Sequence, residues 1–129
     1  MKDIYIIIFV LPLFVLGQTQ QEIDKKLNEI SNKMNKSCPM VIDECTTMLN
    51  TFGGMGKVRY RIQIDTDCLT DYDNIGEWII YQNYSMTNSF CTDPSFKSFR
   101  EMDVTMVWTY YDLYGNWTGK VELNNKDCK

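Results

Sequence analysis

The densest group of side chains that could do chemistry is the acidic stretch at residues 65–74. Oxygen ligands at alternating positions are what Ca²⁺ requires, and this stretch offers Asp65, Asp67, Asp71 and Asp73. It departs from an EF-hand loop, because Leu69 stands where the third ligand belongs and no glycine follows it. We therefore expect a solvated loop whose aspartates cap the next helix, and we keep a calcium site as the alternative.

The chain has few of the residues that enzymes commonly use in catalysis. Histidine, the commonest metal ligand and general base, is absent. Asp43 and Glu44 are adjacent, and neighbours on a strand point to opposite faces, so they would not flank one substrate. A cysteine nucleophile would have only carboxylates or lysines as its base. We favour a non-catalytic protein without cofactors, and an unfamiliar enzyme built on carboxylates or tyrosines is the alternative.

Five cysteines occur, at Cys38, Cys45, Cys68, Cys91 and Cys128. Their spacing matches no zinc pattern. In an exported chain, disulfides are the default interpretation, and an odd count leaves at least one thiol free or shared with another chain.

The N-terminus indicates export. Lys2 precedes an apolar run at residues 4–16, and Val15-Leu16-Gly17 suits a signal peptidase. The run is too short for a membrane anchor and is quickly followed by polar residues. A signal peptide at residues 1–17 would leave one domain at 18–129, periplasmic or secreted, with no membrane anchor. The net charge of −4 without basic runs argues against nucleic acid as a partner.

Aromatic side chains are the remaining candidates for binding. Tyr and Trp carry much of the energy at interfaces. Tyr111 and Tyr114 fall on the outward face or the turn of an expected hairpin, where a binding role and cross-strand packing explain them equally well. Core packing accounts for Trp108, Tyr110 and Trp117. The chain is thus expected to bind a protein or cell-envelope partner.

The strongest β pattern lies at residues 104–111 and 116–123, which are crowded with Val, Thr, Trp and Tyr. Asp112 and Gly115 between them suit a type I turn followed by a left-handed glycine. Alternation places one set of side chains on the core face: Val104, Met106, Trp108 and Tyr110, then Trp117, Gly119, Val121 and Leu123.

Residues 45–52 and 57–65 form a second expected hairpin around a glycine turn, and the clean alternation at 57–65 puts Arg59 and Arg61 on the polar side. A capping box, Thr19 with Glu22, opens an expected helix at 20–35. A second helix at 74–90, with Asp73 as its cap, and a helical turn from Pro94 follow. The order α-β-β-α-α-β-β predicts an α+β fold, in which two hairpins form one antiparallel sheet with helices packed on one face.

Short motifs resemble a loose group of small exported Gram-negative bacterial proteins of unknown function. They are Cys38-Pro39-Met40 with Asp43-Glu44 and Thr46, Cys91-Thr92-Asp93-Pro94, Tyr111-Asp112 with Gly115, and Asp127-Cys128. The signal ending in Leu16-Gly17-Gln18 is similar to those of Gram-negative exported proteins. The resemblance implies a periplasmic or secreted location and a Cys91–Cys128 bond. It implies no catalytic residues and leaves the pairing of Cys45 and Cys68 open.

Overall fold

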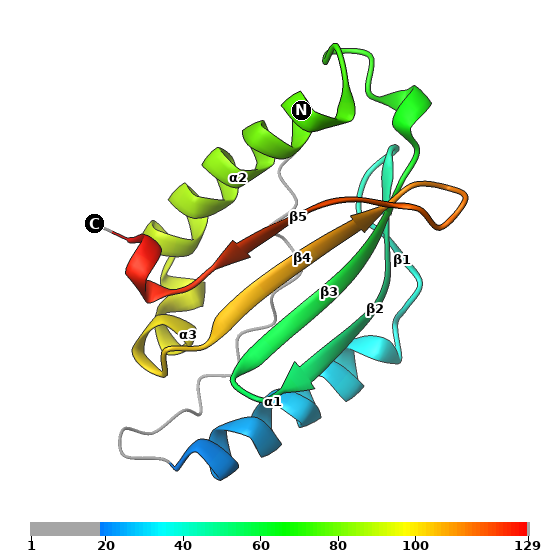
Figure 1. Cartoon of the computed structure of the whole chain (residues 1–129). Helices are drawn as coiled ribbons and strands as arrows, with labels where there is room; N and C mark the ends of the chain where they lie inside the picture. Colours follow the sequence, from blue (N-terminus) through cyan, green and yellow to red (C-terminus); the bar gives the residue numbers. More distant parts are fainter. Residues whose placement is uncertain (1–18, 129) are drawn as a thin grey trace.

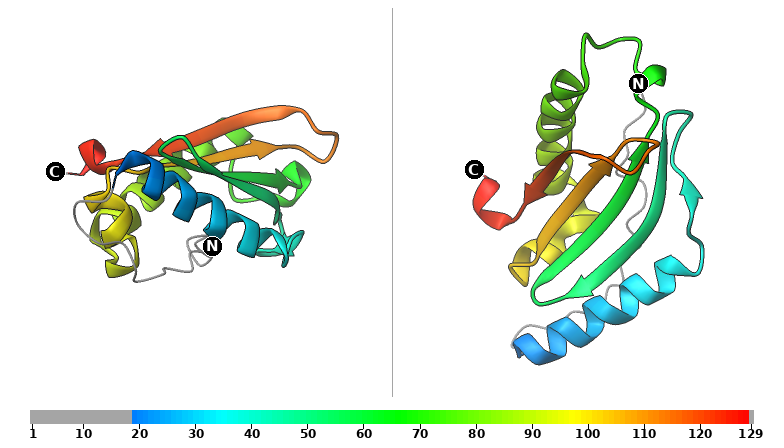
Figure 2. Two further views of the ribbon diagram at one scale, coloured as in Figure 1. Left: turned by 90° about the horizontal axis from the view of Figure 1, so that it is seen from below. Right: turned by 45° about the vertical axis from the view of Figure 1, so that its right-hand side comes forward.

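The computed structural model describes residues 19–128, so the signal peptide expected at residues 1–17 lies outside the described part. It shows the expected α+β layer, in which a five-stranded sheet carries both long helices on one face (Figures 1 and 2). Alternate side chains of the strands and the apolar sides of the helices form one buried cluster between the two layers.

The strands lie in chain order across the sheet, and the two expected hairpins are both present. The strands are β1 (Met40–Val41), β2 (Thr46–Gly54), β3 (Lys57–Ile64), β4 (Thr105–Tyr111) and β5 (Trp117–Leu123). All neighbours pair antiparallel except β3 and β4, which run parallel. The helices between the hairpins return the chain to the start of β3, where Thr105 N donates to Gly56 O at 2.9 Å. A parallel pair requires such a crossover.

Helix α1 (Gln20–Asn35) has the bounds that its sequence predicts. Thr19 and Glu22 form the capping box, and the four apolar residues of the stripe are buried: Ile23, Leu27, Ile30 and Met34. The last residue, Asn35, fixes the helix to β2. Its Oδ1 accepts from Thr51 N at 2.7 Å, and its Nδ2 donates to Thr51 O at 2.9 Å.

Helix α2 (Ile75–Thr92) packs under β5 and ends two residues later than the predicted helix at 74–90. Its cap is Asn74, whose Oδ1 accepts from Glu77 N at 2.9 Å, so the prediction of Asp73 as the cap was wrong. Trp78 is buried edge-on against Tyr110, with ring centroids 5.1 Å apart. Short turns complete the chain: η2 (Thr66–Cys68), η3 (Pro94–Phe96), α3 (Lys97–Glu101) and η4 (Asn125–Asp127).

The placement of Trp117 in the core was also wrong. The pairing of β4 with β5 shifts between Tyr110 and Tyr111, so that Tyr110 faces Gly119 while Tyr111 faces Trp117. Such a bulge puts an extra residue into one strand and reverses the alternation beyond it. Trp117 therefore lies beside Tyr111 and is 60% exposed.

The turn between β2 and β3 gives a first testable prediction. Met55 and Gly56 both have positive φ, 55° and 75°, as the tight hairpin turn of type I′ requires. An L-residue in this conformation costs about 1–2 kcal/mol, and asparagine tolerates it better than most. We expect Met55→Asn to raise the free energy of unfolding by about 1 kcal/mol in urea titrations. Met55→Ala removes the same exposed side chain without easing the backbone, and an equal gain there would contradict this reason.

Candidate functional site

The sheet face opposite the helices is covered by no described helix, and it faces the viewer in Figure 1. We call it the uncovered face. Its side chains alternate with the buried ones along each strand and form rows across the sheet. One row runs Asn50, Arg61, Thr109, Lys120, and the next runs Phe52, Arg59, Val107, Glu122. The rows bring residues from four strands together, as the sequence alone could not show.

The charge of the uncovered face comes from the strands' polar positions. Lys57, Arg59, Arg61 and Lys120 lie on it, and Glu122 is the carboxylate among them. Lys120 Nζ contacts Glu122 Oε1 at 3.1 Å. The hydrogen bond from Lys120 lowers the pKa of Glu122, and the charges of Lys57 and Arg59 lower it further. The face is thus cationic in a chain whose net charge is −4.

The tip of the β4–β5 hairpin presents three large apolar side chains to solvent. Leu113, Tyr114 and Trp117 are 52%, 89% and 60% exposed. Asp112 holds their turn, because its Oδ1 accepts from Tyr114 N at 2.8 Å and from Asn116 N at 2.9 Å. The bond from the Asn116 backbone is the main cause of the lowered pKa of Asp112. Gly115 takes a φ of 85°, which matches the expected left-handed glycine.

Tyr111 and Tyr114, the two residues proposed from the sequence, occupy different surroundings. Tyr114 is on the exposed tip, whereas Tyr111 is half-buried on the uncovered face. The guanidinium carbon of Arg61 lies 4.7 Å from the centre of the Tyr111 ring. Sequence reasoning missed Trp117 because the bulge that exposes it leaves no signal in the alternation.

A second exposed apolar group lies on α2, where Ile80, Tyr81 and Tyr84 are 71%, 39% and 78% exposed. These side chains stand on the outer side of a helix whose other side is core. Tyr81 also lies near the ring of Tyr72, with ring centroids 6.0 Å apart. The exposure of the α2 group is similar to that of the hairpin tip.

The acidic stretch forms a turn and a loop between β3 and α2. Asp65 caps η2, and its Oδ1 accepts from Asp67 N at 3.1 Å. Asp71 and Asp73 follow in the loop before Asn74. Within residues 19–128, no three or more His, Cys, Asp or Glu side chains are grouped so as to hold a metal ion. The arrangement gives the calcium alternative no support.

Thermal melts test this point directly. A ligand that binds only the folded protein raises its melting temperature, so about 1 mM CaCl₂ and an excess of EDTA should give melts that coincide within about 1 °C. A rise of several degrees with CaCl₂, reversed by EDTA, would instead restore a calcium site at Asp65, Asp67, Asp71 and Asp73.

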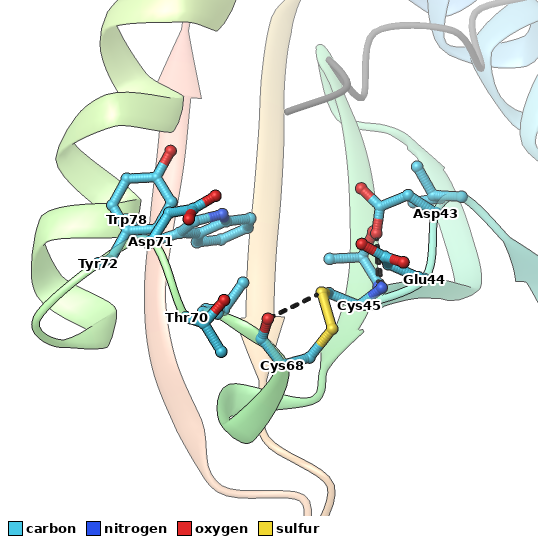
Figure 3. Close-up of a pocket in the computed structure, with 11 residues that line it drawn as sticks. Asp43, Glu44, Cys45, Cys68, Thr70, Asp71, Tyr72 and Trp78 are labelled. Atoms are coloured by element: carbon cyan, nitrogen blue, oxygen red, sulfur yellow. Dashed lines mark hydrogen bonds between the residues drawn. A yellow bond between two sulfur atoms is a disulfide. The ribbon is translucent and has the colours of Figure 1, made fainter.

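A pocket of about 580 Å³ lies beside the Cys45–Cys68 disulfide (Figure 3). Asp71 lines it on the side of α2, and Asp43 and Glu44 line it on the side of β2. Asp43 and Glu44 lie in a bend before β2, so the earlier assignment of this pair to a strand was wrong. Asp43 Oδ1 already accepts from the backbone N–H groups of Cys45 and Thr46. The pocket sulfurs are bonded to each other and offer no thiol nucleophile.

The cysteines form two intrachain bonds. Cys45 joins Cys68, and Cys91 joins Cys128, the pair that the bacterial resemblance implies. The second bond connects the end of α2 with the segment after β5. Cys38 is the free cysteine of the described residues, and burial raises the pKa of its thiol. A raised pKa leaves less thiolate, so nothing marks Cys38 as a reactive site.

The fold and its two disulfides define a class of small α+β domain with helices on one face of a mostly antiparallel sheet. Three solved structures share this fold. A suspected secreted protein of Pseudomonas aeruginosa matches with a TM-score of 0.73 and 9% identity, covering 88% of this chain and 100% of its own. Two others are pilotins of type II secretion systems. EpsS of Vibrio vulnificus has a TM-score of 0.69 and 9% identity, and AspS of Vibrio cholerae has 0.66 and 13%.

Both pilotins are covered over 94% of their chains, and they cover 85% and 84% of this one. At these identities the likeness shows the fold alone. No family model matches the chain, and no curated protein matches it either. No helix in residues 19–128 is both long enough and apolar enough to cross a membrane.

Proposed function

We propose that this chain is a small exported, disulfide-stabilised module that binds a protein partner through the tip of its β4–β5 hairpin and catalyses no reaction. The observation that carries the proposal is the exposure of Leu113 and Tyr114 on the turn of the β4–β5 hairpin together with Trp117, the first residue of β5. Tyr and Trp with large contact area and few rotatable bonds are the usual anchors of interfaces.

Order in the turn supports a binding role over accidental exposure. Asp112 fixes the backbone at Tyr114 and Asn116, so the anchors lose little freedom when they are buried by a partner. Exposed apolar groups that serve no purpose are a solubility cost. Three of them at the tip of one hairpin therefore favour a docking site.

Export is supported by three independent features: the signal-like N-terminus, the two disulfides, and folds shared with a suspected secreted protein and two secretion-system pilotins. Disulfides persist in oxidising compartments such as the periplasm. The pilotins also favour a protein over other cell-envelope material as the partner, since each is described as belonging to a type II secretion system.

Photo-crosslinking in the producing cell tests the proposal. With a photoreactive amino acid at Tyr114, we expect a discrete crosslinked protein that is absent when the probe replaces Lys33, which is exposed on α1. Once that partner is purified, the double variant Tyr114→Ala with Trp117→Ala should raise Kd about 100-fold, which is the size of effect seen when interface anchors are truncated.

A matched variant carries Ile80→Ala and Tyr84→Ala on α2, which are equally exposed. The Kd of this variant should stay within about two-fold of the unmodified protein's Kd, because its side chains lie outside the proposed site. If the α2 variant loses binding and the hairpin variant keeps it, the partner docks on the helix and the proposed site is wrong.

A further inference from the structure

The uncovered face of the sheet has a charge opposite to that of the chain as a whole. The chain has 17 acidic and 13 basic residues. On this face, however, Lys57, Arg59, Arg61 and Lys120 surround the single carboxylate of Glu122. Segregation of this kind creates a local positive potential that attracts anionic groups despite an unfavourable net charge.

Two cations of the face are held by contacts: Lys120 by Glu122, and Arg61 by the ring of Tyr111. Arg61 lies over the Tyr111 ring, which orients its planar guanidinium without neutralising it. Val107 sits between Arg59 and Glu122 in its row and is only 3% exposed, although no helix covers it. Long charged side chains such as those of Arg59 and Glu122 can cover an apolar neighbour with their stems while their charged ends remain in water.

The spacing of the cations suits an extended polypeptide. Arg59 and Arg61 are two residues apart on one strand, which is about 7 Å. Carboxylates on alternate residues of an extended segment have this same spacing. Phe52, 51% exposed, lies beside Arg59 in its row, and Trp117 lies beside Tyr111, so both offer apolar surface at the margins of the cationic positions.

We propose that the uncovered face binds an acidic segment of a polypeptide, with Arg59, Arg61 and Lys120 receiving its carboxylates. The inference rests on the proposed function, because it names the chemistry of the partner's segment and extends the site from the hairpin tip across the sheet. Arginine is the better residue for this task, since its fork can hold both oxygens of one carboxylate.

A short segment fits better than a long polyanion or a flat anionic membrane. Asp65 follows the last residue of β3 and Asp112 follows the last residue of β4, and because these two strands are parallel, both carboxylates lie at the same end of the face. A nucleic acid or a lipid surface that extended beyond this end would meet these carboxylates, and like charges repel.

Fluorescence anisotropy with the mature protein tests the inference. The probe is a short labelled peptide in which glutamate and leucine alternate, and the control peptide has glutamine in place of glutamate. We expect the acidic peptide to bind and the glutamine peptide to bind at least about ten-fold more weakly, since charge attraction is removed. Raising NaCl from about 30 mM to about 300 mM should weaken the binding of the acidic peptide about ten-fold, because salt screens the charges.

Charge-reversal variants locate the binding. The double variant Arg59→Glu with Arg61→Glu should weaken the binding of the acidic peptide by more than about ten-fold. Lys33→Glu with Lys97→Glu makes the same change in net charge at exposed positions away from this face and should change Kd by less than about two-fold. Arg61→Lys keeps the charge without the planar fork, and we expect an intermediate loss.

Several results would overturn the inference. One is equal binding of the glutamine peptide, and another is an equal effect of the two double reversals. Tighter binding to phosphatidylglycerol vesicles or to a single-stranded oligonucleotide would assign the face to a lipid or to nucleic acid instead. Each of these outcomes leaves the crosslink at Tyr114 untouched, so the hairpin site and the acidic-segment site fail separately.

Discussion

Gly53→Ala should lower the free energy of unfolding by about 3 kcal/mol, because the added methyl group overpacks a site without free space. A Cβ at Gly53 would overlap the carbonyl oxygen of Leu27 in α1. The helix backbone cannot move away easily, since Asn35 and Thr51 are joined by a pair of hydrogen bonds. Urea or thermal unfolding monitored by circular dichroism gives the measurement.

Gly115→Ala is the matched control. Gly115 has a φ of 85° and nothing within 4 Å of the added Cβ, whereas Gly53 has the opposite combination. The control should cost about 1–2 kcal/mol from its backbone conformation alone. If Gly53→Ala lowered the free energy of unfolding by less than about 1 kcal/mol, the backbone of α1 would not pack against Gly53 of β2 as described.

Removal of the Cys91–Cys128 bond is the second large effect. Cys91→Ser with Cys128→Ser should lower the free energy of unfolding by about 3 kcal/mol, because the bond closes a long loop and restricts the unfolded chain. The two cysteines are 37 residues apart in sequence. For a domain of this size the melting temperature should fall by about 10 °C or more.

The change Cys38→Ser provides the control for this experiment, since Cys38 is outside both bonds. It should change the free energy of unfolding by less than about 1 kcal/mol, as most substitutions without a structural role do. Binding at the hairpin tip should survive the loss of the Cys91–Cys128 bond at low temperature, because Tyr114 is held by Asp112 instead. An unchanged melting temperature in the Cys91/Cys128 variant would mean that the bond does not form in the mature protein.

The elements themselves follow from local sequence signals. The capping box of Thr19 and Glu22 and the four-residue apolar stripe after it determine α1, and its bounds agree with the prediction. The alternation after Lys57 determines β3, and Asp112 with Gly115 determines the turn of the second hairpin. These signals act between residues close in sequence, so they can be read without knowing the fold.

The sequence also determined which positions could be polar but not which of them would meet. Arg59 and Arg61 alternate with the core residues of β3, and this is visible in the sequence. That they stand beside Lys120, two strands away, depends on the parallel pairing of β3 with β4. No local pattern specifies this pairing, because either strand could have taken another neighbour.

What only the tertiary structure decided is where the candidate site lies. A single bulge at Tyr110 and Tyr111 moves Trp117 from the core side to the exposed side, since the strand period is two and one extra residue reverses it. The helices pack on the other face of the sheet and leave this face uncovered, and the parallel pairing of β3 with β4 places its cations in adjacent rows. Local propensity and capping are properties of neighbouring residues, whereas register, strand order and the choice of covered face arise from packing between segments far apart in the chain.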